Sequence, residues 1–232
     1  MALFVVSFLV LSLIAPLNSL YGWHDETHLA VAKVAGYYKW YNAAGADIAK
    51  IKAGPVEMYN HYFNNYADTP VTSEMVLAQI DHYNDPRDSE GHLYGAIIAS
   101  LRKYDEIRAS GKYPEYHVAL CAHYTADLSQ PLHSLPYDDF NKTNHDTFDG
   151  IVDREVLASI ALIEKNMYQI RLCPDRFEED LAQEIARVAN LSRNLGKRLR
   201  EENRIITREE AYVQLGHSAS LLRAILKHLG KI

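Results

Sequence analysis

Two histidine–aspartate pairs constrain this sequence more than any other feature. His123 precedes Asp127 by four residues, His145 precedes Asp149 by four, and His133 stands between the pairs. Residues four apart on a helix share one face, so each pair would project an imidazole and a carboxylate to the same side. Imidazole and carboxylate groups are the usual nitrogen and oxygen ligands of zinc. The spacing therefore indicates a candidate metal-binding cluster.

The rest of the chain is patterned as helices joined by polar loops. Apolar residues recur close to every 3.6 residues from Phe177 to Leu199. Thr207 and Glu210 form a capping box that predicts the start of a final helix, and Gly230 predicts its end. Earlier helices are predicted at about 25–43, 56–66, 72–80, 91–109, 114–129 and 145–168. With no linker, repeat or alternating strand pattern, the sequence predicts an all-α, single-domain, multi-helix bundle.

These predicted helices place the two pairs. His123 and Asp127 fall on the helix at 114–129, which Pro131 helps to end. His133 follows in the exit loop, and the second pair, at 145 and 149, opens the next helix. The metal cluster is therefore expected between helices.

Further candidate ligands lie closer to the N-terminus. Asp68 and His82 flank the short helix predicted at 72–80, and His28 stands five residues after Trp23. Each has an ordinary explanation when taken alone, such as a turn residue or a solvated histidine. The histidines at 24, 61, 92, 117, 217 and 228 show no comparable spacing and are assigned structural roles.

Residues 1–22 are typical of a secretory signal peptide, because they contain no charged residue and carry the apolar run Ala2 to Leu17. That run is rather short for a membrane span, which needs about 20 residues. An uncleaved anchor remains the alternative, since Lys and Arg are missing before the run and Leu20 is large for the −3 position. The sequence predicts cleavage after Gly22, a mature domain at 23–232, and a secreted or periplasmic location.

Charge and cysteine content restrict the function further. The formal net charge of −6 disfavours nucleic-acid binding through Lys and Arg. Cys121 and Cys173 could pair in an oxidising compartment, whereas the apolar surroundings of Cys121 are equally consistent with a buried free thiol.

The spacing H-x3-D-x5-H, followed by H-x3-D, resembles the ligand run of the trinuclear-zinc phosphodiesterases. This group comprises the bacterial zinc-dependent phospholipases C and the single-strand-specific zinc nucleases of fungi and plants. The segments AHYTADLSQPLH and DHYNDPRD resemble the family's sequences around its metal ligands. Trp23, just after the leader, matches the family's N-terminal tryptophan. The resemblance is specific from residue 23 to about residue 155.

The resemblance implies three zinc ions per chain. The first would be held by Asp68, His82, His123 and Asp127. The second would be held by His133, His145 and Asp149. The third would be held by the amino group and carbonyl of Trp23 with His28 and Asp127, so that Asp127 bridges two sites. An acylated nitrogen is a poor ligand, so the third site would be complete only after cleavage before Trp23.

The activity implied by the resemblance is zinc-dependent hydrolysis of phosphodiesters. A bound zinc lowers the pKa of its water to around 7, and Asp68 is the candidate that orients or deprotonates this water. The chain would act as a secreted monomer with no obligate protein partner, on a phospholipid membrane surface or on single-stranded nucleic acid.

The phospholipase C-like interpretation is favoured by the sequence HYNDPRD, the Asp68–His82 spacing and the short gap between His133 and His145. The nuclease alternative is favoured by the four residues between Trp23 and the next ligand, and by Asp at 149. Glu26 falls where the choline-binding phospholipases have an acidic residue, which makes it a candidate for substrate binding. The candidate is weak, because Thr69 and Gln79 stand where those enzymes have aromatic choline contacts. A non-catalytic zinc-binding module is the third reading.

Overall fold

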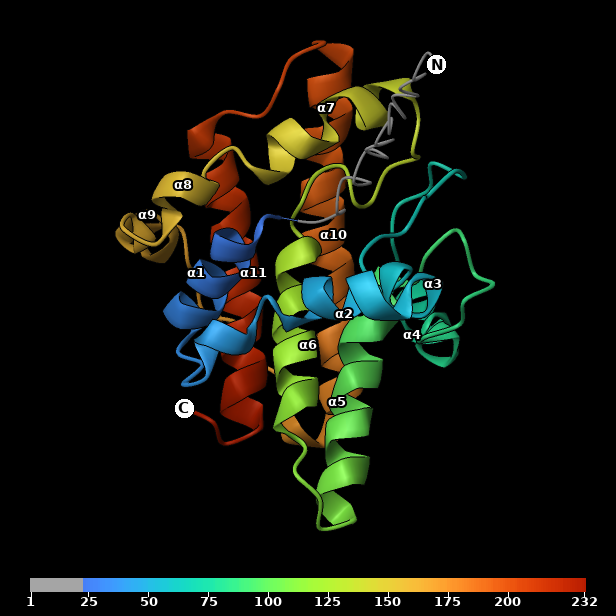
Figure 1. The fold of residues 1–232 in the computed structure, drawn as a ribbon, viewed down its shortest axis with the longest axis vertical. Coiled ribbons are helices and arrows are strands. Elements are labelled where there is room, and N and C mark those ends of the chain that lie inside the picture. The colour runs from blue at the N-terminus through green and yellow to red at the C-terminus, as the bar shows by residue number, and fades with distance from the viewer. Residues whose placement is uncertain (1–22) are drawn as a thin grey trace, which may run out of the picture.

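The computed structural model describes residues 23–232, and the leader expected at 1–22 lies outside this part of the chain. Four long helices run roughly side by side in Figure 1: α5 (Leu93–Ala109), α6 (Glu115–Asp127), α10 (Phe177–Glu201) and α11 (Arg208–His228). The described residues form helices and short 3₁₀ turns without a strand, which confirms the all-α, single-domain prediction. None of these helices has both the length and the apolar character that a membrane crossing requires.

Shorter helices lie on both sides of the long ones and near their upper end (Figure 1). They are α1 (Asp25–Ala35), α2 (Gly45–Ala53), α3 (Pro55–Met58), α4 (Ser73–Ala78), α7 (Asp139–Asp149), α8 (Asp153–Val156) and α9 (Ile160–Lys165). The 3₁₀ turns are η1 (Trp40–Asn42), η2 (Ile80–His82) and η3 (Pro174–Arg176).

Several predicted helix boundaries were wrong; the helix predicted at 56–66, for example, ends at Met58. Two of the differences have a clear local reason. The helix predicted over 25–43 ends at Ala35, because Gly36 adopts φ 97°, a left-handed conformation that glycine reaches without steric cost. The helix predicted from 145 begins at 139, because the Asp138 side chain caps it by accepting a hydrogen bond from the Asn141 backbone N–H. The second His–Asp pair therefore closes α7 and does not open a helix.

Helix α6 lies at the centre of the molecule, and every residue from 118 to 127 is buried. It packs against α5 on one side and against α1 and α11 on the other. Its apolar residues accordingly contribute to two hydrophobic clusters, one containing α1 and α11 and one containing α5 and α10. A helix buried all round is expected to be apolar. His123 and Asp127 break that pattern and must find polar partners inside the protein.

The loop after α6 is held in place by α10 and by the segment after α3. A Cβ added at Gly196 of α10 would lie 2.5 Å from the carbonyl oxygen of Pro131, so only glycine allows this close approach. On the other side, the Phe63 backbone N–H donates to the carbonyl oxygen of His133 at 2.8 Å. These contacts fix the position of His133 relative to α6.

The two cysteines are free thiols in this structure. Cys121 is fully buried in the cluster with α5, whereas Cys173 is exposed. Burial raises the pKa of the Cys121 thiol to about 12, so it acts as a small apolar side chain. Of the two alternatives drawn from the sequence, the buried thiol is the one observed.

The capping box at the start of α11 gives a stability prediction. Thr207 Oγ1 accepts from the Glu210 N–H at 3.2 Å, and Glu210 Oε2 accepts from the Thr207 N–H at 3.0 Å. We expect Thr207→Ala to lower the free energy of unfolding by about 1 kcal/mol, because a helix N–H loses its acceptor. Thr207→Ser is the matched control and should stay near the parent. Urea unfolding measures both, and equal stability of the Ala and Ser variants would contradict the cap.

Candidate metal centre

Imidazoles from four segments converge on the carboxylate of Asp127 at the end of α6. Asp127 Oδ2 lies 3.0 Å from His61 Nδ1 and 3.2 Å from His123 Nε2. Asp127 Oδ1 lies 3.4 Å from His28 Nε2 and 3.7 Å from His133 Nδ1. All five side chains are buried. One carboxylate thus stands at the junction of α1, the segment after α3, α6 and the loop that follows α6.

A second carboxylate, Asp47, enters the same cluster from α2. Its Oδ1 lies 3.7 Å from His123 Nε2 and 3.9 Å from His61 Nδ1. The rings of His28 and His123 stack with their centroids 3.6 Å apart. Lys50, one turn after Asp47, places its Nζ 2.7 Å from Asp47 Oδ1 and is itself buried. A cation and an anion of α2 therefore both point into the protein.

The second His–Asp pair builds an adjoining group. His145 Nε2 lies 3.3 Å from His133 Nε2 and 3.4 Å from Asp149 Oδ2. Gln130 Nε2 donates to Asp149 Oδ1 and holds that carboxylate in place. Because His133 also approaches Asp127, the two groups are continuous.

Hydrogen bonds behind the imidazoles fix which nitrogen faces the cluster. His123 Nδ1 lies 2.7 Å from the carbonyl oxygen of Ala43, and His145 Nδ1 lies 2.6 Å from Asn141 Oδ1. Both oxygens can only accept, so each Nδ1 carries a hydrogen and each Nε2 faces the cluster. Asn141 is itself oriented by its Nδ2, which donates to the Leu132 carbonyl at 3.0 Å. Backing hydrogen bonds of this kind commonly orient metal-binding histidines.

Burial sets the protonation of these groups. It lowers the pKa of His28, His61 and His133 well below the ordinary value, and that of His145 to about 3. These imidazoles are therefore neutral, which is the form that binds metal. Burial also opposes a charge on His123, but Asp47 and Asp127 outweigh it and raise the pKa of His123 to about 9. Burial raises the pKa of Asp127 to about 6.

The arrangement fits metal ions on two counts. Three buried groups have ligand atoms within 4.8 Å of one another: His28 with His123 and Asp127; Asp47 with His61 and His123; and His133 with His145 and Asp149. Among the described residues, no hydrogen-bond partner is present for His28 Nδ1 and Nε2, Asp127 Oδ1 or His133 Nδ1. Unsatisfied buried polar atoms are costly, and a cation would satisfy those that present a lone pair. The three groups could bind metal ions.

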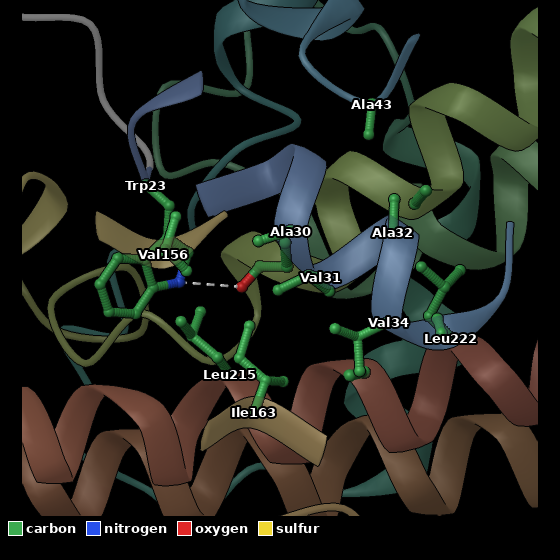
Figure 2. Close-up of a cluster of buried hydrophobic side chains, with 14 of the residues drawn as sticks. Trp23, Ala30, Val31, Ala32, Val34, Ala43, Val156, Ile163, Leu215 and Leu222 are labelled. Carbon is green, nitrogen blue, oxygen red and sulfur yellow. Dashed lines mark hydrogen bonds between the residues drawn. The ribbon is translucent and has the colours of Figure 1, made fainter. Parts of the chain in front are cut away.

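Trp23 is anchored beside both groups. Figure 2 shows it among buried side chains, with its indole Nε1–H donating to the carbonyl oxygen of Ala126 at 3.1 Å. The next residue, His24, donates its backbone N–H to the Asp149 carbonyl at 3.2 Å. The segment before α1 therefore contacts the neighbours of Asp127 and the end of α7 together.

Two predicted ligands are not brought into the cluster. The Asp68 side chain is 68% exposed and pairs with Arg193 and, at 2.6 Å, with Lys197 of α10. These cations hold the pKa of the Asp68 carboxyl below its ordinary value. His82 is also exposed, and its Nδ1 lies 2.7 Å from Asp88 Oδ2. The metal-binding role predicted for Asp68 and His82 has no support from this placement.

Asp47 and His61 lie beside His123 in the cluster, where the sequence predicted Asp68 and His82. The sequence pattern predicts a structural role for His61 and does not mark Asp47 as a ligand. A signal was nevertheless present, because Asp47 and His61 are fourteen positions apart, as are Asp68 and His82. Spacing alone cannot separate the two pairs, whereas burial does.

A cavity of about 350 Å³ opens beside the second group. It is lined by His145, by Asn141 and by the rings of Tyr59, Tyr62 and Tyr137, among other residues. Such a cavity offers a ligand access to one side of the cluster. Glu26, the weak substrate-binding candidate, is exposed in the first turn of α1 and is not among the lining residues.

A pair of matched substitutions tests the reassigned ligands. We expect Asp47→Asn to lower the zinc affinity by about 10-fold or more, because a neutral amide oxygen is a weaker ligand than a carboxylate. Asp68→Asn is the matched control, because Asp68 is also followed by a histidine fourteen positions later. This variant should leave the zinc affinity unchanged. Zinc titration followed by metal analysis measures both. Loss of zinc in Asp68→Asn with retention in Asp47→Asn would restore the sequence-based ligand set.

Comparisons of the chain with protein-family models, with curated proteins and with solved structures give no match. The residues and the structure establish an all-α protein with buried His/Asp groups that could hold metal ions.

Proposed function

We propose that this protein is a secreted zinc-dependent phosphodiester hydrolase, of the phospholipase C type in its chemistry. The observation that supports this most is the position of Asp127, whose two carboxylate oxygens face imidazoles of both groups. A carboxylate shared in this way is what the resemblance to trinuclear-zinc phosphodiesterases requires. The family resemblance supplies the reaction, and the buried donor atoms support the metal.

The ligand set of the proposal differs from the sequence-based one at two positions. One zinc would be held by Asp47, His61, His123 and Asp127. A second would be held by His133, His145 and Asp149. A third would be held by the Trp23 amino group and carbonyl, His28 and Asp127. Structural zinc sites usually have four protein ligands, whereas the second set has three side chains and leaves a position for substrate or water.

The protein residues have separate tasks in this proposal. Bound zinc would supply Lewis acidity and lower the pKa of a water to near 7. Asp47 replaces Asp68 as the carboxylate that accepts a proton from the attacking water at one of its Oδ atoms. Lys50 supplies the positive charge beside Asp47 in the metal-free protein. Ala43 and Asn141 keep the imidazoles of His123 and His145 oriented.

Phospholipid is the first substrate class in the proposal. The phospholipase-like separation of Asp and His is retained by Asp47 and His61, and the short gap between His133 and His145 is unaffected. Single-stranded nucleic acid is the second candidate, because the cavity beside His145 carries three tyrosine rings on which bases could stack. The nuclease-like spacing from Trp23 to His28 points the same way.

The proposed activity is tested by chelation and reconstitution. We expect the purified protein to hydrolyse bis(p-nitrophenyl) phosphate, and EDTA to lower the rate by about 100-fold or more, because the metal stabilises transition-state charge. Added zinc should restore the rate. Phosphatidylcholine vesicles and single-stranded DNA, assayed in parallel, rank the two substrate classes. Hydrolysis of none of the three substrates by zinc-loaded protein, with one tightly held metal, would instead support a non-catalytic binding module.

The N-terminal ligand gives a second test. A free α-amino group has a pKa of about 7.7–8.0 and can bind zinc at neutral pH, whereas an acylated nitrogen has little basicity. Protein that starts at Trp23 should therefore bind the third zinc more tightly than protein that starts at Met-Gly22-Trp23. The measurement is zinc content with hydrolysis rate. Equal values for the two forms would exclude the amino group as a ligand.

A further inference from the structure

Helix α2 carries both buried charged side chains and exposed apolar ones. Asp47 and Lys50 point into the candidate metal centre, whereas Ile48 and Ile51 are 63% and 62% exposed on the outside. Isoleucine is among the residues most often buried, so two exposed side chains one turn apart are unusual. The exposed isoleucines and two residues of the candidate centre therefore lie on the same short helix.

These isoleucines belong to a continuous surface. We define the α2 patch as Tyr38, Tyr41, Ile48, Ile51, Tyr113 and Tyr116, all of which are exposed. Four of them, Tyr41, Ile48, Tyr113 and Tyr116, line one surface hollow of about 300 Å³. Lys39 Nζ lies over the ring of Tyr38 at 5.1 Å and over that of Tyr113 at 4.6 Å, which joins Tyr38 to the rest. Scattered apolar residues need no explanation, but a contiguous patch marks an interaction surface.

The two segments that form the α2 patch expose charges of one sign. In the two segments that form it, 37–53 and 111–116, the solvent-accessible charged side chains are Lys39, Lys52 and Lys112. The two acidic residues of these segments, Asp47 and Glu115, are buried. The chain as a whole has a formal net charge of −6. A positive apolar surface on an acidic protein is complementary to an apolar, negatively charged partner.

We propose that the α2 patch docks the protein on the surface of an anionic phospholipid bilayer, a proposal that rests on and extends the proposed function. Isoleucine side chains can enter the region between head groups and acyl chains, tyrosine rings suit the head-group level, and lysines face lipid phosphates. Because α2 also carries Asp47, docking through its outer face would hold the candidate centre at the lipid surface.

The test measures vesicle binding separately from hydrolysis. Zinc-free protein in EDTA is sedimented with sucrose-loaded vesicles of phosphatidylglycerol and phosphatidylcholine, or of phosphatidylcholine alone. We expect stronger binding to the anionic vesicles, weakening as salt is raised. The Ile48→Ser/Ile51→Ser variant should bind about 10-fold or more weakly, because two apolar side chains no longer leave water. Lys52→Gln/Lys112→Gln should bind more weakly and lose part of the salt dependence.

Matched controls come from exposed apolar residues outside the patch. Leu162 and Ile205 are each 45% exposed, and Leu162→Ser/Ile205→Ser should bind vesicles like the parent. Circular dichroism checks that all variants are folded. The rate on bis(p-nitrophenyl) phosphate, which needs no surface, should be the same in the isoleucine variant and the parent.

The outcomes separate this inference from the proposed function. Anionic-vesicle binding lost in Ile48→Ser/Ile51→Ser supports the patch, even where no phospholipid is hydrolysed and the proposed function fails. Hydrolysis of the soluble phosphodiester without patch-dependent vesicle binding overturns the patch and leaves the proposed function in place. The inference is also overturned if the isoleucine variant loses single-stranded DNA binding in place of vesicle binding. A parent protein that forms a dimer but does not bind vesicles would also contradict the inference, if sedimentation shows that the isoleucine variant loses the dimer.

Discussion

The structure depends most on the burial of the Asp127 carboxylate at the end of a helix that is itself buried on every side. A buried ionised carboxylate is costly unless opposite charge or hydrogen bonds compensate it. Here four imidazoles surround the carboxylate, and one of them, His123, is favoured in its protonated form by Asp47 and Asp127. Lys50 adds a further cation at Asp47. The metal-free protein thus holds its own positive charge where metal ions are proposed to bind.

The fold can be understood as the support for that cluster. Helix α6 brings His123 and Asp127 to the junction of two hydrophobic clusters, so neither side chain can turn to solvent. Gly196 allows α10 to pack closely against the loop that follows α6. The Phe63 N–H donates a hydrogen bond to the backbone carbonyl of His133. The indole of Trp23 fixes the start of α1 against Ala126. Packing and hydrogen bonds, and not the ligands alone, therefore set the distances between the imidazoles.

Sequence reasoning succeeded where a pattern lies within one element and failed where two elements must be compared. The run through His123, Asp127 and His133 could be read because the spacing sits on one helix and its exit loop. Asp47 was missed because its short helix shows no clear apolar period: Asp47 and Lys50 are buried, whereas Ile48 and Ile51 are exposed. Choosing between equally spaced Asp–His pairs requires knowing which is buried, and burial is a property of the whole fold.

The most direct test of the account is a crystal structure of the zinc-loaded protein with anomalous diffraction recorded at the zinc absorption edge. We expect anomalous peaks within the buried cluster, one of them between Asp47, His61 and His123 and another between His133, His145 and Asp149. We also expect Lys50 to move away from Asp47 Oδ1, because a zinc ion would repel its ammonium. Zinc bound at Asp68 or His82, with no anomalous peak at Asp127, would contradict the account.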